Sequence, residues 1–142
     1  MALALRRPGY MHRLLIVDDE DSIRFSLTAY FEAQGFETDS ADNIEQVEKL
    51  LEKGPYAVAI SDLRLDGRQT MSGLEVVNLI HRRHPETVII VLSAYKAVEV
   101  EAEAKQRGIA AYLRKPKPLP DLAQIVFGLL ADAGRCALPE MA

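Results

Sequence analysis

Short apolar runs recur at intervals along this chain. Three of them, 13–17, 56–60 and 88–92, are rich in aliphatic residues and stop at an Asp or Ser residue. Two weaker candidates lie at 36–40 and 110–113. Runs this short that are apolar on both faces are typical of strands in a sheet that is covered on both sides.

The segments between these runs carry apolar residues at helical spacing. In the first segment, Ile23, Leu27 and Phe31 fall at i, i+4 and i+8, and Gly35 follows as the expected C-terminal cap. Further helices are predicted around 44–51, 74–80, 96–107 and 122–130. A strand–helix order repeated five times predicts an open parallel sheet with right-handed crossovers and helices on both faces.

Polar residues at the ends of the predicted strands carry the candidate chemistry. Asp18 and Asp19 end the first strand, Asp62 ends the third, Ser93 ends the fourth, and Lys115 follows the fifth. Ligands of open parallel sheets bind outside the carboxyl ends of the strands, so these groups are expected on one rim. Three carboxylates on one rim repel each other unless a cation or protons neutralise them.

This set of groups suits phosphoryl chemistry. Carboxylate oxygens are ligands that Mg²⁺ prefers, and Mg²⁺ commonly helps to bind phosphate. Lys115 supplies a positive charge and Ser93 a hydroxyl donor for phosphoryl oxygens. A carboxylate can also act as a nucleophile that forms an aspartyl phosphate.

Each of these residues also has an ordinary structural explanation. Asp18 suits the N-terminus of the first helix through capping and the helix dipole. Asp62 suits a turn and Ser93 a helix cap, while Lys115 could be solvated and Tyr112 could fill the core. Taken separately, these explanations do not account for a phosphoryl-binding residue type at every strand end of one rim.

Composition narrows the choice of partners. The chain has 142 residues, 49% hydrophobic and 27% charged, which is ordinary for one globular domain. A net charge of −4 gives no bulk attraction to nucleic acid, and no apolar run is long enough to cross a membrane.

Cys136 is a single cysteine, so no internal disulfide is possible. The order of charge and apolar residues at the N-terminus is the reverse of a signal peptide, and we expect a cytoplasmic protein.

The chain resembles the response-regulator receiver domains of bacterial two-component signalling. The matching stretches are 14–20 (LLIVDDE), 60–65 (ISDLRL), 72–75 (SGLE), 91–95 (VLSAY) and 112–116 (YLRKP). The resemblance covers 12–131, with 1–11 and 132–142 expected as tails. It implies a doubly wound, flavodoxin-like three-layer sandwich of five helices and a five-stranded parallel sheet in the order 2-1-3-4-5.

The resemblance implies a metal-assisted phosphoacceptor. Asp62 would accept the phosphoryl group. Asp18, Asp19 and Asp62 would bind Mg²⁺, and the backbone carbonyl of Arg64 would complete the protein ligands. No other cofactor is implied.

The resemblance also implies a switch. Ser93 would hydrogen-bond the phosphoryl group, Lys115 would pair with it, and Tyr112 would turn inward when Ser93 moves. Lys115-Pro116 would be a cis peptide bond, which is tolerated before proline. The partners would be a sensor histidine kinase or a phosphotransfer protein, and a second copy bound through the fourth and fifth helices.

Such a chain would be a signalling switch and not an enzyme, catalysing only its own phosphotransfer and dephosphorylation. The alternative is a pseudo-receiver that keeps the fold as an interaction module without phosphorylation. A flavodoxin-like cofactor carrier is disfavoured, because the acidic residues 18–21 would repel a phosphate ester. A hydrolase with an Asp nucleophile would need a second carboxylate where Arg64 stands.

The chain departs from the family pattern in two loops. Gly73 lies 11 residues after Asp62, a longer spacing than the family usually has, which places an insertion within 66–71. Asp66 stands where the family usually has proline. Lys117 and Pro118 follow the Lys-Pro motif, so an unusual start of the last helix is expected.

Overall fold

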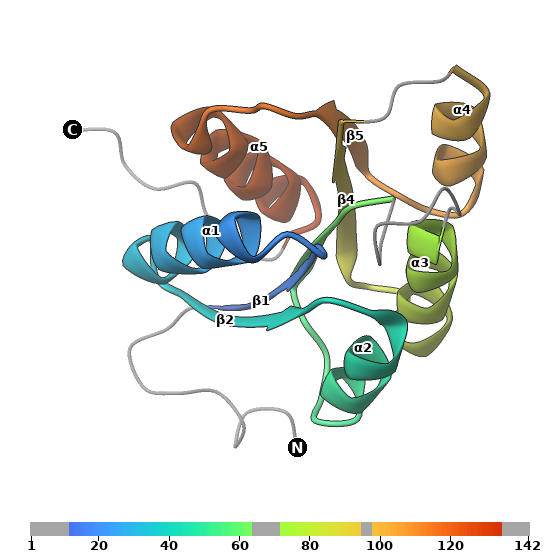
Figure 1. The fold of residues 1–142 in the computed structure, drawn as a ribbon, viewed down its shortest axis with the longest axis horizontal. Coiled ribbons are helices and arrows are strands. Elements are labelled where there is room, and N and C mark those ends of the chain that lie inside the picture. Colours follow the sequence, from blue (N-terminus) through green and yellow to red (C-terminus); the bar gives the residue numbers. More distant parts are fainter. Residues whose placement is uncertain (1–11, 64–71, 95–97, 135–142) are drawn as a thin grey trace.

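The computed structural model describes residues 12–63, 72–94 and 98–134. Strands and helices alternate along these residues as predicted (Figure 1). The strands are β1 (His12–Val17), β2 (Phe36–Ala41), β3 (Val58–Ser61), β4 (Val88–Ser93) and β5 (Ala111–Arg114). The helices are α1 (Asp21–Ala33), α2 (Ile44–Leu51), α3 (Ser72–Arg83), α4 (Val98–Gln106) and α5 (Leu119–Asp132).

The five strands form one parallel sheet in the order β2-β1-β3-β4-β5, which confirms the predicted topology. Leu14 of β1 pairs with Thr38 on one side and with Val58 on the other. The chain moves outward from β1 to β2 and then returns to β3 on the opposite side of β1. The carboxyl ends of β1 and β3 therefore form the switch point of strand order, where open α/β sheets bind their ligands.

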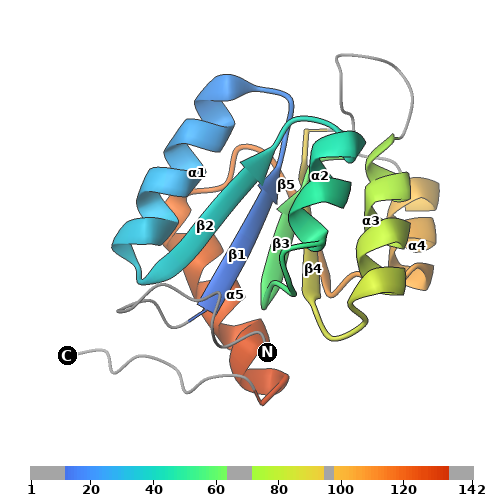
Figure 2. The same ribbon diagram turned by 90° about the horizontal axis from the view of Figure 1, so that it is seen from below.

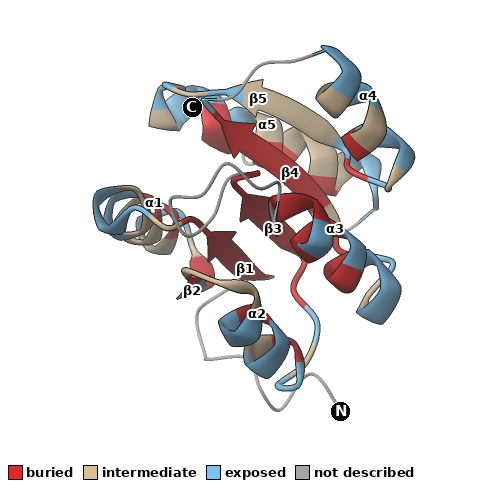
Figure 3. Cartoon of the chain, turned by 45° about the vertical axis from the view of Figure 1, so that its right-hand side comes forward, coloured by how far each residue is buried: buried red, intermediate tan, exposed pale blue. Residues whose placement is uncertain are grey.

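Helices cover both faces of the sheet (Figure 2). Leu14 and Ile16 of β1 pack into a core with α1 and α5, whereas Leu15 and Val17 pack into a second core with α2 and α3. Alternate residues of a strand face opposite sides, so a strand between two helical layers is apolar at every position. Figure 3 shows the result, with the central strands buried and the outer helix faces exposed.

Most element boundaries differ by a few residues from the predicted ones, and two of the differences concern the start of an element. Tyr56 and Ala57 were predicted in a strand, but β3 begins at Val58. Helix α5 begins with Pro118 at its N-cap and Pro120 in its first turn, where the missing N–H group has no helical partner to lose. The predicted insertion at 66–71 and the carbonyl of Arg64 lie outside the described residues. Within the described ranges, no helix is both long and apolar enough to span a bilayer.

Candidate functional site

The ends of β1 and β3 bring two acidic residues together. The Asp62 N–H donates to the Val17 carbonyl at 2.8 Å, and the Asp18 N–H donates to the Ala41 carbonyl at 3.1 Å. The ladder hydrogen bonds thus continue one residue beyond the strands and hold both backbones in register. Asp18 is 3% exposed and Asp62 is 7% exposed, so both carboxyl groups lie in a largely desolvated place.

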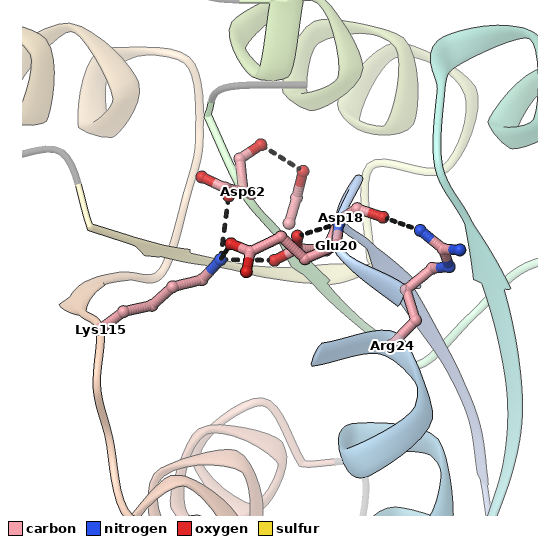
Figure 4. Close-up of polar contacts among 6 residues, drawn as sticks. Asp18, Glu20, Arg24, Asp62 and Lys115 are labelled. Atoms are coloured by element: carbon pink, nitrogen blue, oxygen red, sulfur yellow. Dashed lines mark hydrogen bonds and ion pairs between the residues drawn. The ribbon is translucent and has the colours of Figure 1, made fainter. Parts of the chain in front are cut away.

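Lys115 joins these two acidic residues from the end of β5, the edge strand on the other side of β4. Its N–H donates to the Ser93 carbonyl at 3.0 Å, which fixes the backbone after β5 against the end of β4. Its Nζ lies 2.6 Å from Asp18 Oδ2 and 3.0 Å from Asp62 Oδ2 (Figure 4). The cis peptide bond expected at Lys115-Pro116 is confirmed.

Burial and charge act against each other on these groups. Burial raises the pKa of the Asp18 carboxyl group, and the hydrogen bond from Lys115 partly opposes this rise. For Lys115, burial by itself would lower the pKa, but hydrogen bonds to Asp18 and Asp62 outweigh burial and raise it. Lys115 is therefore held as a cation at neutral pH, where it offsets part of the negative charge around it.

The carboxyl groups fit a divalent cation. Oxygens of Asp18, Asp19, Glu20 and Asp62 all lie within 4.8 Å of one another. The opposite ligands of an octahedral Mg²⁺ ion are about 4 Å apart, and Mg²⁺ prefers carboxylate oxygens and water. The negative charge of these groups exceeds the charge of the Lys115 ammonium group, so a bound cation would relieve their repulsion.

The two predicted switch residues lie on β4 and β5. Ser93 ends β4, is 1% exposed, and is joined to Lys115 by the backbone hydrogen bond. Tyr112 pairs with Val91 across β4 and β5 and packs, partly buried, against the core under α3 and α4. Both residues therefore lie on the two strands whose carboxyl ends are joined by the Lys115–Ser93 backbone hydrogen bond.

Comparison with known proteins identifies the family. Residues 14–127 match the family model of the response regulator receiver domain. The chain belongs to the response regulator receiver family. Receiver domains are signalling switches of two-component systems.

Individual relatives support the same assignment. Over 129 residues, the receiver is 35% identical to the response regulator PilR of Pseudomonas aeruginosa, covering 90% of this chain and 27% of PilR. It is 34% identical over 119 residues to the photosynthetic apparatus regulatory protein RegA of Rhodobacter capsulatus, covering 84% of this chain and 63% of RegA. The chain thus spans less than two thirds of the length of either relative.

Solved structures agree on the fold. The CheY-like receiver domain protein of Methanospirillum hungatei JF-1 superposes with a TM-score of 0.81 at 26% identity. The match covers 87% of this chain and 97% of that one. The predicted flavodoxin-like sandwich is thereby confirmed.

Gly73 anchors helix α3 of the receiver to the backbone that directly follows β3. Its N–H donates to the Leu63 carbonyl at 2.8 Å. A Cβ atom at this position would lie 2.2 Å from the Asp62 carbonyl oxygen and 2.4 Å from the Leu63 Cα. Only glycine permits such a close approach, so the chain returns directly beside Asp62 in spite of the longer spacing between Asp62 and Gly73.

Two residues of the site were not predicted from the sequence. Glu20 Oε1 lies 3.7 Å from Lys115 Nζ, and the Glu20 N–H donates to Asp18 Oδ1 at 2.9 Å. Arg24 Nη1 donates to the Asp18 carbonyl at 2.6 Å (Figure 4). The position of Glu20 directly after the Asp pair was a usable signal. The basic Arg24 in the first turn of a helix was another, because the helix dipole disfavours cations there.

Proposed function

We propose that Asp62 accepts a phosphoryl group from the phosphohistidine of a sensor histidine kinase or of a phosphotransfer protein. The observation that carries this proposal is the Lys115 ammonium group, which contacts both Asp18 and Asp62 among acidic side chains. A carboxylate nucleophile, a fixed cation and ligands for a divalent ion are the parts that phosphoryl transfer to a carboxylate requires.

The proposed step moves one phosphoryl group. An Asp62 carboxylate oxygen attacks phosphorus while the P–N bond breaks, and the bonding electron pair stays on the imidazole nitrogen of the donor. Lys115 offsets charge on the phosphoryl oxygens, and the Ser93 hydroxyl donates a hydrogen bond to one of them. Mg²⁺ bound by the acidic residues of the site would supply further positive charge near those oxygens.

The acidic ligands for Mg²⁺ would be Asp18, Asp19 and Asp62, joined by the Arg64 carbonyl. The phosphorylated state would then change the surface of the domain, 12–131. Ser93 and Tyr112 would transmit the change because their strands, β4 and β5, join the site to α4 and α5. The readout would be a homodimer through α4 and α5, or a partner or output domain bound there.

Labelling with acetyl phosphate tests the proposal. In the presence of Mg²⁺, intact-mass spectrometry of the wild-type chain should show the mass gain of one phosphoryl group, and EDTA should prevent it. Asp62→Asn should abolish the gain while keeping the fold, because the substitution preserves shape and removes a repelling charge. Asp39→Asn is the matched control, since Asp39 lies in β2 and contacts Arg13 and Tyr56 instead of Lys115.

The outcomes separate the two candidate functions. Undiminished labelling of the Asp62→Asn variant would show that Asp62 is not the acceptor. A wild-type chain that is folded but gains no mass from acetyl phosphate would favour a pseudo-receiver that acts only through its surface.

A further inference from the structure

Arg24 places a positive charge where a helix alone would disfavour it. It lies in the first turn of α1, next to the positive end of the helix dipole. Its Nη1 donates to the Asp18 carbonyl at 2.6 Å, and its Nη2 pairs with the Asp21 carboxylate. The Arg24 side chain is only 19% exposed, whereas the Asp21 side chain is 93% exposed. Of the two contacts of Arg24, the hydrogen bond to Asp18 is therefore more buried than the ion pair with Asp21.

The hydrogen bond from Arg24 completes the fixation of Asp18. The Asp18 N–H is bound to Ala41, Oδ1 accepts from the Glu20 N–H, and Oδ2 accepts from Lys115. The carbonyl that begins the turn from β1 into α1 is held by the guanidinium group of Arg24. The backbone at Asp18 therefore has one partner on each side, from β2 and from α1.

We propose that Arg24 is a positioning residue for the metal-binding turn 18–20, an inference that rests on the proposed function. A cation bound by Asp18 and Asp19 pulls their carboxylates toward itself, and the peptide between them must hold its orientation against that pull. Arg24 holds the carbonyl of this peptide, so the carboxylates are presented in place before the ion arrives. Partners that orient ligands in this way usually change metal affinity by about 10-fold or more when they are removed.

Charge and positioning predict opposite effects for the loss of Arg24. If Arg24 acted only as a nearby cation, its removal would strengthen the binding of a divalent ion, because one repulsive charge would be gone. If it positions the turn, its removal weakens binding. Arg24→Lys separates the two further, since lysine keeps the charge but lacks the planar fork that reaches two acceptors.

The test measures binding of the metal alone. Mn²⁺, which takes oxygen ligands as Mg²⁺ does, is titrated into the full chain, and free Mn²⁺ is followed by electron paramagnetic resonance. We expect the dissociation constant to rise roughly 10-fold for Arg24→Ala and to rise by a smaller factor for Arg24→Lys. Arg107→Ala is the matched control, because Arg107 forms a similar helical ion pair with Glu103 on α4, away from the site.

The outcomes distinguish this inference from the proposed function. An unchanged or lower Mn²⁺ dissociation constant for folded Arg24→Ala overturns the positioning role, as does a wild-type chain that binds no Mn²⁺. If circular dichroism shows that Arg24→Ala is unfolded, Arg24→Lys decides, and a wild-type value for it overturns the role. Labelling of the wild-type chain by acetyl phosphate reports on the proposed function separately.

Discussion

Two ion-pair clusters, each around a largely buried cation, lie toward opposite ends of the parallel sheet. The carboxyl-end cluster consists of Asp18, Asp19, Glu20, Asp62 and Lys115. The amino-half cluster consists of Arg13, Glu37, Asp39 and Tyr56. Both combine a buried cation with carboxylates, but the donors and acceptors are balanced differently in each.

The amino-half cluster is centred on the Arg13 guanidinium group. Arg13 pairs with Asp39 at 3.2 Å and with Glu37 at 3.9 Å, and it donates to the Pro55 carbonyl at 3.4 Å. Its guanidinium carbon lies 4.3 Å from the centre of the Tyr56 ring, and the Tyr56 hydroxyl donates to Asp39 at 2.7 Å. Two carboxylates face one guanidinium group and a neutral phenol, so the cluster has one more negative than positive charge.

The carboxyl-end cluster carries a larger surplus of negative charge. Four carboxyl groups lie within 4.8 Å of one another, and three of them, those of Asp18, Glu20 and Asp62, pair with the Lys115 ammonium group. The comparison teaches that burial of charged groups does not by itself mark a functional site. The larger surplus of negative charge distinguishes the carboxyl-end cluster, because the repulsion among its carboxylates favours a bound cation.

The largest expected effect follows loss of the cation at the carboxyl end. Lys115→Met should lower the rate of labelling by acetyl phosphate roughly 100-fold, because it removes one electrostatic partner of the transferred group. Quenched-flow or timed intact-mass measurements at saturating Mg²⁺ give this rate.

Arg13→Met is the matched change in the amino-half cluster. It should leave the labelling rate of the folded protein unchanged but lower the free energy of unfolding by about 3 kcal/mol, because a buried cation that pairs with both Glu37 and Asp39 is removed. Saturating Mg²⁺ should not restore this loss in urea denaturation. A labelling rate for Arg13→Met as low as that of Lys115→Met would break the distinction between the clusters.

A smaller effect is expected from the backbone that carries the acceptor. Gly73→Ala forces a methyl group against the Asp62 carbonyl, and we expect the free energy of unfolding to fall by about 2 kcal/mol. Gly128→Ala in α5 is the control, because no atom beyond its chain neighbours and the adjacent backbone of its own helix lies within 4 Å of its added Cβ. There alanine should raise stability by about 0.5–1 kcal/mol through its higher helix propensity. Equal effects of the two changes in urea denaturation would contradict the close approach at Gly73.

The smallest effect concerns pH and the amino-half cluster. Burial, together with the hydrogen bond to Asp39, raises the pKa of the Tyr56 phenol far above its ordinary value. The protonated phenol therefore favours the folded state fully below pH ~10, the ordinary pKa of tyrosine, and this contribution is lost as the pH rises further. Tyr56→Phe should cost about 1 kcal/mol at pH 8, and the difference from wild type should shrink between pH 10 and 11. A difference that stays constant over this range in urea denaturation would contradict the assignment.

Much of this arrangement could be predicted from the sequence because it depends on local patterns. The short apolar runs and the polar residues that end them placed Asp18, Asp62 and Lys115 at strand ends. The parallel topology placed these strand ends on one rim of the sheet. The contacts of Glu20 and Arg24 were missed because they depend on the turn from β1 into α1. The start of β3 was placed too early at Tyr56, since a buried aromatic residue fits a strand and a loop equally well by hydrophobicity.

The sequence by itself determined the order of the elements, the parallel sheet and the residue types at its carboxyl edge. Hydrophobic periodicity encodes these features residue by residue, so they can be read without the fold. Only the tertiary structure decided that Lys115 lies between Asp18 and Asp62, that Gly73 touches the Asp62 backbone, and that Arg24 holds the Asp18 carbonyl. Such contacts join residues far apart in the chain or around a tight turn, and their distances depend on how the packed layers position the strand ends.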